Sequence, residues 1–124
     1  MRLLLDTHVV LWWSTDSPRL REEARDAIRN ADQVMVSAAS VWEAAIKAGM
    51  GKLTISVPFS AVAEANGFDR LPITFEHAAA VAALPEHHRD PFDRMLVAQA
   101  LADGLILVTQ DRAMEPYGVP VLWA

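Results

Sequence analysis

The sequence predicts an α/β fold in which helices cover both faces of a central, mainly parallel β-sheet. Short apolar or β-branched runs alternate along the chain with longer segments whose apolar residues recur at helical spacing. Strands that alternate with helices form right-handed βαβ units, and these build a parallel sheet. The chain has 124 residues, 52% of them hydrophobic, which suffices for one core but not for two. We therefore predict a single domain over residues 1–124.

In the first half of the chain, each expected strand leads into a helix. In order, we expect a strand over 3–5, a helix over 7–13, an amphipathic helix over 19–30, a strand over 33–37 and a helix over 40–48. The first run is three leucines and the second is rich in β-branched residues, as buried strands are. Ser40 is the expected N-cap of the last helix, and Gly49 its end.

The second half continues the alternation after a connection over 49–58, where two glycines and a proline predict little regular structure. In order, we expect a helix over 59–66, a strand over 71–74, a helix over 76–84, a helix over 91–103, a strand over 105–109 and a strand over 119–123. Gly104 ends the long helix. Pro120 predicts that the last strand lies at a sheet edge, because proline cannot donate to the strand ladder.

The composition limits the kinds of site that the chain can hold. There are no cysteines, so disulfides and thiolate metal sites are excluded, and any metal must bind to oxygen or imidazole. A hard cation such as Mg²⁺ or Mn²⁺ fits best. The net charge of −5 argues against a broad basic surface for nucleic acid. It leaves room for a nucleic-acid enzyme, because clustered carboxylates that bind cations also raise the acidic count.

The N-terminus predicts neither export nor membrane insertion. It reaches an acidic residue after three leucines, which is too short for a signal peptide. The chain has no apolar run near the roughly 20 residues that a membrane span needs. We therefore expect a cytoplasmic protein that does not bind membranes.

Five acidic residues are expected at the edge of the sheet where ligands bind in open α/β folds, beyond the carboxyl ends of the strands. Asp6 ends the first strand, Asp111 follows the strand over 105–109, and Glu43 lies about one turn into the helix after the second strand. The other two, Asp90 and Asp93, begin the long helix. If this helix runs antiparallel to the strands, as a βαβ crossover requires, its N-terminus lies at the same edge.

Each acid also has a purely structural interpretation. Asp6 and Asp111 can cap the helical turns that follow them, and Glu43 can pair with Lys47 at the favourable i,i+4 spacing. Asp90 before a proline is a good N-cap, and Asp93 lies in the first helical turn, where the helix dipole favours negative charge. Together, however, unpaired carboxylates at one edge repel one another, and a divalent cation removes that penalty.

An acidic cluster of this kind has a chemical use. One or two Mg²⁺ or Mn²⁺ ions about 4 Å apart can activate water and stabilise the leaving oxygen of a phosphodiester. Hydrolytic cleavage of nucleic acid is the predicted reaction. Hydroxyl groups are expected nearby from Ser40 and Thr109. The basic side chains expected close enough to meet phosphates are Arg94, Arg112 and Lys47.

Four blocks of sequence carry a resemblance to a known family. They are L-L-L-D-T-H-V-V-L-W-W at 3–13, V-S-A-A-S-V-W-E-A-A-I-K at 36–47, H-H-R-D-P-F-D-R-M-L-V-A-Q-A at 87–100 and L-V-T-Q-D at 107–111. In these blocks the chain resembles PIN-domain proteins from end to end, and specifically the VapC-type ribonuclease toxins of bacterial toxin–antitoxin pairs. A lone Asp after a strand is weak evidence, whereas four blocks in the same order are specific.

The resemblance implies a PIN-like α/β/α sandwich and a metal-dependent endoribonuclease that acts on RNA. It also implies a homodimer and neutralisation by a cognate antitoxin. Carried over by position, the acidic quartet that serves as catalytic and metal-binding residues consists of Asp6, Glu43, Asp93 and Asp111. The family pattern places its third acid directly before the R-M-L-V-A-Q-A helix body, which is Asp93. Asp90 is then primarily the helix cap, with a contact to the metal through water as its further role.

The four histidines, His8, His77, His87 and His88, have no zinc-like spacing and are interpreted as helix-face or loop residues. Two other functions compete with the nuclease. A receiver-type signalling module resembles this chain in size and in its acidic Mg²⁺ pocket. It has paired acids after its first strand and a lysine after its last, whereas here Asp6 stands alone. An inactive PIN-like binding protein is the second alternative, which the intact quartet argues against.

Overall fold

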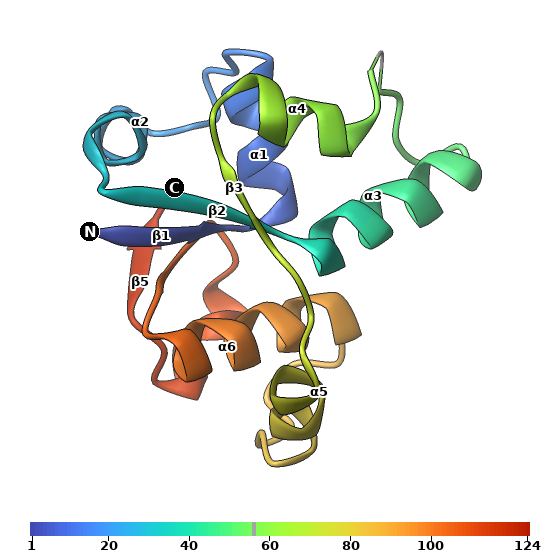
Figure 1. Ribbon diagram of the computed structural model, residues 1–124, viewed down its shortest axis with the longest axis vertical. Helices are drawn as coiled ribbons and strands as arrows, with labels where there is room; N and C mark the ends of the chain where they lie inside the picture. Colours follow the sequence, from blue (N-terminus) through green and yellow to red (C-terminus); the bar gives the residue numbers. More distant parts are fainter. Residues whose placement is uncertain (56) are drawn as a thin grey trace.

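The computed structural model describes residues 1–55 and 57–124 and forms three layers, with a parallel sheet between two layers of helices (Figure 1). The strands are β1 Arg2–Leu5, β2 Gln33–Ser37, β3 Asp69–Leu71, β4 Ile106–Thr109 and β5 Val121–Trp123. Their order across the sheet is β3-β2-β1-β4-β5, and every neighbouring pair is parallel. The predicted α/β class and parallel sheet are therefore confirmed, and β5 with its preceding Pro120 does lie at an edge.

The helices lie on both faces of the sheet. They are α1 Thr7–Ser14, α2 Glu22–Asn30, α3 Ala38–Gly49, α4 Phe59–Ala65, α5 Phe75–Ala82 and α6 Pro91–Asp103, with a 3₁₀ helix η1 at Arg112–Tyr117. Figure 1 shows α1, α2 and α4 on one face and α5 and α6 on the other. Among the helices of residues 1–55 and 57–124, none is both long enough and apolar enough to cross a bilayer.

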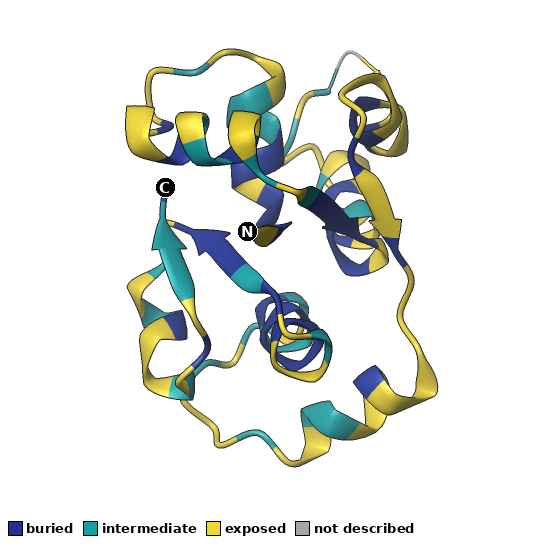
Figure 2. Ribbon diagram, turned by 60° about the vertical axis from the view of Figure 1, so that its left-hand side comes forward, coloured by how far each residue is buried: buried dark blue, intermediate teal, exposed yellow. Residues whose placement is uncertain are grey.

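Alternate residues of β1 point into two separate apolar cores. Leu3 and Leu5 pack with residues of α1, α2 and α4, such as Val10, whereas Leu4 packs on the other face with residues of α6, such as Leu96. All three leucines are fully buried, and each contributes about 1.5–3 kcal/mol of hydrophobic stabilisation. Figure 2 shows buried residues on the strands and on the inner sides of the helices. The sheet is thus fixed from both sides.

The register of the sheet brings the ends of three strands to one edge. Leu5, the last residue of β1, pairs with Val36 of β2 and with Val108 of β4. Asp6 therefore follows β1 beside Ser37 and Thr109, the last residues of the neighbouring strands. The carboxyl edge of the sheet is where the candidate site is built.

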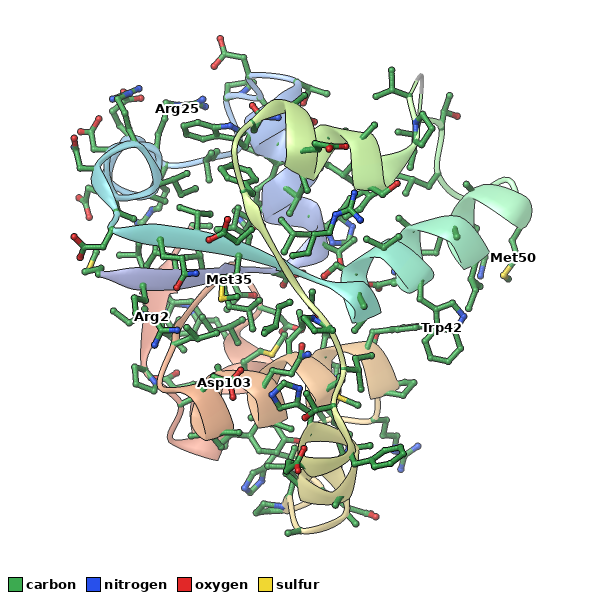
Figure 3. The ribbon with its side chains drawn as sticks, viewed as in Figure 1. Arg2, Arg25, Met35, Trp42, Met50 and Asp103 are labelled. Atoms are coloured by element: carbon green, nitrogen blue, oxygen red, sulfur yellow. The ribbon has the colours of Figure 1, made fainter. Side chains whose placement is uncertain are left out.

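Helix α6 runs antiparallel to the strands, as the crossover argument requires. The guanidinium of Arg2, at the start of β1, donates to the carbonyl of Asp103, at the end of α6, with an Nη1–O distance of 3.2 Å (Figure 3). The C-terminus of α6 thus lies at the amino edge of the sheet, and its N-terminus lies at the opposite, carboxyl edge. This orientation brings Asp90 and Asp93 to the site.

Several predicted boundaries are wrong by a few residues, for identifiable reasons. The helix expected from Ser40 begins at Ala38, because the hydroxyl of Ser37 accepts the Ala39 amide at 3.0 Å and caps α3 one turn earlier. The strand expected over 71–74 is β3, Asp69–Leu71, paired with β2. The helix expected over 19–30 begins at Glu22, because the backbone N–H of Leu20 donates to the carbonyl of Ser17 and closes a turn.

The remaining boundaries shift by one or two residues. The helix over 76–84 is α5, Phe75–Ala82, which begins one residue earlier because Thr74 caps it. The strand over 105–109 begins at Ile106 because the Leu105 amide closes the end of α6, and the strand over 119–123 begins at Val121. The connection expected over 49–58 includes residue 56, which lies outside the described residues.

Helix α6 ends in a Schellman motif that requires a left-handed residue. Gly104 has φ 66° and ψ 42°, and the Leu105 amide donates to the Ala100 carbonyl at 2.9 Å. A Cβ at Gly104 would meet nothing within 4 Å, so the cost of a side chain there is that of the backbone conformation alone.

We predict that Gly104→Ala lowers the free energy of unfolding by about 1 kcal/mol, because alanine in the left-handed region is strained. Urea unfolding measures the change. Gly49→Ala is the matched control, because Gly49 is helical with free space at its Cβ, and alanine there should stabilise by about 0.5 kcal/mol or more. Equal effects at the two positions would contradict the argument.

Candidate metal centre

Asp6 is buried at the end of β1 and is held by the end of the neighbouring strand β4. Its backbone N–H donates to the carbonyl of Val108 at 3.0 Å, and its Oδ2 accepts the hydroxyl of Thr109 at 2.7 Å. Burial raises the pKa of the Asp6 carboxyl above its ordinary value, and the hydrogen bond from Thr109 opposes this only in part. Asp6 is thus fixed in place but costly to keep charged.

Glu43 lies buried on α3, and both of its oxygens already accept short hydrogen bonds. The hydroxyl of Thr7 donates to Oε1 and the ammonium of Lys47 donates to Oε2, each at 2.6 Å. The structural interpretation of Glu43 as the i,i+4 partner of Lys47 is therefore realised. The same hydrogen bond raises the pKa of Lys47, so this cation remains available to offset the charge of the site.

Asp90 and Asp93 occupy one helical turn but have different surroundings. Oδ1 of Asp90 accepts the amides of Phe92 at 2.8 Å and Asp93 at 3.2 Å, so Asp90 is the N-cap of α6, as expected. The side chain of Asp93 is buried, and desolvation together with the charges of other site acids raises its pKa to about 8. Those acids are Asp6, Asp90 and Glu43. The predicted acids therefore do converge on Asp93.

Asp111 follows β4 and meets Asp93 through a histidine. Its Oδ1 accepts the amide of Ala113 at 3.0 Å and caps η1, and its Oδ2 lies 2.9 Å from Nε2 of His88. The same Nε2 lies 2.9 Å from Oδ2 of Asp93. Sequence reasoning grouped His88 with the other loop histidines and missed this contact. The only signal was its position two residues before the capping Asp90, in the block H-H-R-D-P-F-D.

The remaining histidines fit the interpretation given from sequence. The buried His77 forms a capping box with Thr74 at the start of α5 and lies 3.1 Å from a carboxylate oxygen of Asp103 through its Nε2. The ring of His87 packs edge-on against Tyr117, and that of His8 packs at a tilt on Trp12. None of these three rings belongs to the cluster of possible metal-binding groups within the described residues.

The basic side chains expected to meet phosphates have other partners. The guanidinium of Arg94 donates to the carbonyls of Val81 and Pro85 at 3.0 and 2.9 Å, so it binds the end of α5 rather than facing outward. The guanidinium of Arg112 stacks 3.8 Å above the ring of Trp123. Sequence spacing does not reveal these backbone carbonyls, and the role of Arg94 toward phosphates stays a prediction.

The donor atoms of the site suit a hard divalent cation. Ligand atoms from His88, Asp93 and Asp111 lie within 4.8 Å of one another, and Asp6 and Glu43 add carboxylates to the same region. Ser40 lies one turn before Glu43 on α3, and its buried hydroxyl has no hydrogen-bond partner among residues 1–55 and 57–124. The site thus has more oxygen donors than the neighbouring protein groups can bind. Mg²⁺ and Mn²⁺ require oxygen donors of this kind.

Comparison with known proteins assigns the family. A model of the PIN domain matches residues 3–119, so the chain belongs to the PIN-domain family. Over 121 residues it is 36% identical to ribonuclease VapC22 of Mycobacterium tuberculosis, a match that spans 95% of this chain and 93% of that protein. The resemblance inferred from the four sequence blocks is confirmed.

Solved structures share the fold at low sequence identity. VapBC2 from Rickettsia felis, bound to a DNA fragment from its promoter, has a TM-score of 0.74 at 11% identity, over 99% of this chain and 98% of that one. DNA-bound VapBC from Salmonella typhimurium has a TM-score of 0.71 at 17% identity, with the same coverage of both chains. These matches confirm the predicted PIN-like α/β/α sandwich.

The raised pKa of Asp93 predicts how the stability of the metal-free protein depends on pH. Between its ordinary pKa of 3.8 and its folded value of about 8, the folded state holds a proton that the unfolded chain has released. The unfolded state then binds fewer protons, so the free energy of unfolding falls as pH rises through this window. We expect Asp93→Asn to reduce this slope and to stabilise the metal-free protein at pH 8 by about 1–3 kcal/mol.

Urea unfolding in EDTA at several pH values between 5 and 8 measures this effect. Asp26→Asn is the matched control, because Asp26 is an exposed partner of Arg29 on α2, and its replacement should leave the slope unchanged. An Asp93→Asn variant with the slope of the unmodified protein would show that burial and repulsion do not act on this carboxyl.

Proposed function

We propose that this chain, as a single PIN domain over residues 1–124, is a metal-dependent endoribonuclease toxin of the VapC type. It hydrolyses phosphodiester bonds of RNA and is neutralised by a cognate antitoxin protein. The observation that carries the proposal is the convergence of Asp6, Glu43, Asp93 and Asp111 at the carboxyl edge of a PIN-domain sheet. The relationship to ribonuclease VapC22 supports it independently of that geometry.

We assign the metal ligands among the acids at this edge. Asp6, Asp93 and Asp111 would hold one or two Mg²⁺ or Mn²⁺ ions through their carboxylate oxygens. Glu43 would contribute directly or through water, because the oxygens that bind Thr7 and Lys47 keep further lone pairs. Asp90, the N-cap of α6, would contribute through water.

The chemistry that follows is hydrolysis without a side-chain nucleophile. Bound divalent cations activate water and stabilise charge on phosphodiester oxygens. Thr109 and Val108 hold Asp6 in position, and Thr7 and Lys47 hold Glu43 where it can orient a water molecule. Because the pKa of Asp93 is raised to about 8, cation binding would release a proton from this carboxyl near neutral pH.

Protein partners are the second part of the proposal. Several large apolar side chains are exposed, among them Phe75 at 92%, Trp42 at 60% and Met50 at 59%. Trp42 of α3 and Met50, which directly follows it, point outward (Figure 3). Apolar surface of this kind is typical of sites covered by other proteins. Together with the fold shared with VapBC complexes, it supports a bound antitoxin and a homodimer.

The competing functions make different predictions. A receiver-type signalling module is not compatible with membership of the PIN-domain family. An inactive PIN-like binding protein would keep the fold and the acidic site but would cleave nothing. Turnover therefore separates the two PIN-domain possibilities.

We predict discrete cleavage products when the purified, antitoxin-free protein is incubated with total RNA and Mg²⁺ or Mn²⁺. EDTA should abolish them, and Asp6→Asn should reduce the rate by about 100-fold or more, since even the loss of an outer-shell partner of a metal site costs 10–100-fold. Asp26→Asn is the control variant, and circular dichroism checks the fold of each protein. Products that persist in EDTA would refute the metal dependence.

A second comparison separates the two acids at the start of α6. We expect Asp93→Asn to abolish cleavage while the protein stays folded, and Asp90→Asn to remain active, because asparagine is also a good N-cap. Asp90→Ala should cost about 1 kcal/mol of stability through loss of the cap. Retained activity in Asp93→Asn together with a folded but inactive Asp90→Asn would reverse the assignment.

A further inference from the structure

His88 connects two predicted metal ligands that come from different parts of the fold. It lies in the loop between α5 and α6, and its Nε2 is 2.9 Å from Oδ2 of Asp93 and 2.9 Å from Oδ2 of Asp111. Asp93 belongs to the first turn of α6, whereas Asp111 follows β4. No backbone ladder joins these two elements at this edge within the described residues, so the imidazole is the bridge between them.

The backbone and the ring of His88 both have further partners. The backbone N–H of His88 donates to the hydroxyl of Tyr117 at 2.9 Å, and Arg94 donates to the same hydroxyl at 3.2 Å. The backbone N–H of Asp90 donates to Nδ1 of His88 at 3.3 Å. The side chain is only 20% exposed, so it has little freedom to turn away.

These contacts determine which ring nitrogen carries a proton toward the acids. An N–H group that points at Nδ1 requires a lone pair there, so the neutral ring carries its proton on Nε2. In this tautomer His88 presents an N–H group to Asp93 and Asp111, and it has no lone pair at Nε2 to offer a metal.

We infer that His88 is a positioning residue of the proposed metal centre, one that fixes Asp93 and Asp111 against each other by sharing its Nε2–H between their carboxylates. The inference rests on the proposed function, because it concerns the same cation site. Each carboxylate keeps further lone pairs for a cation. Hydrogen bonds of this kind orient ligating carboxylates, and their loss typically weakens metal binding by 10–100-fold.

Two other roles for His88 are distinguishable from this one. If the ring were itself a ligand, a bound cation would be coordinated directly by nitrogen. If it only anchored the loop to Tyr117, its removal would lower stability but leave metal affinity unchanged. The positioning role predicts weaker metal binding without a nitrogen ligand.

Mn²⁺ serves as the probe in the test, and its binding to the purified full chain is followed by calorimetry and by electron paramagnetic resonance. We expect His88→Ala to raise the dissociation constant for Mn²⁺ by 10–100-fold. His88→Gln, whose amide N–H reaches to about the same place as Nε2, should restore most of that loss. His87→Ala is the matched control, because the neighbouring ring contacts Tyr117 but belongs to no acidic cluster among the described residues, and its affinity should be unchanged.

The spectra supply a measurement that a purely structural role would not change. Pulsed measurements on the Mn²⁺ complex should show no coupling to a directly coordinated nitrogen, and a coupling that disappears in His88→Ala would overturn the inference in favour of a ligand. Wild-type affinity in folded His88→Ala would overturn it in favour of a loop anchor. Absence of Mn²⁺ binding to the unmodified protein would overturn the metal centre itself and this inference with it. If His88→Ala does not fold, the Mn²⁺ dissociation constant of His88→Gln is the deciding measurement instead.

Discussion

Four carboxyl groups lie at one edge of the parallel sheet, where burial disfavours the charged forms of Asp6 and Asp93 and neighbouring acids add repulsion. Burial and the neighbouring acids raise the pKa of Asp93 to about 8, and burial also raises the pKa of Asp6. Most polar contacts of the region offset this penalty: Thr109 donates to Asp6, Lys47 pairs with Glu43, and His88 lies between Asp93 and Asp111. These partners balance the acidic charge only in part, and a divalent cation would neutralise much of what remains.

The position of α6 decides whether this cluster can form, and buried polar contacts fix that position. The hydroxyl of Ser37 donates to the side chain of Gln99 at 2.6 Å, which ties α6 to the end of β2. On its outer side, His77 of α5 lies 3.1 Å from Asp103 through its Nε2. Because the interior has a low effective dielectric constant, such satisfied polar contacts favour one packing arrangement over others. The first turn of α6, with Asp93, is therefore held against the sheet edge.

Structural and functional roles coincide in several of the acids rather than excluding each other. Asp111 caps η1 with one oxygen and turns the other toward His88. Glu43 pairs with Lys47 and still contributes charge to the cluster. In the metal-free protein this arrangement lowers the stability of the fold at the site where the protein is proposed to act. Such a trade-off between stability and activity is common. The acids at this edge thus lower the stability of the fold, and in the proposed function they bind the cation that the reaction needs.

The sequence alone determined the order of strands and helices, the parallel sheet and the acids expected at its edge, because hydrophobic period and strand-end position are local properties of the chain. It also separated the cap Asp90 from Asp93 through helix-start rules and the family pattern. Only the tertiary structure revealed His88 between Asp93 and Asp111, and the use of Arg94 by backbone carbonyls. His88 and Asp111 are 23 residues apart, and nothing in hydrophobic period or helix-start rules records which side chains meet when α6 and its preceding loop pack on the sheet.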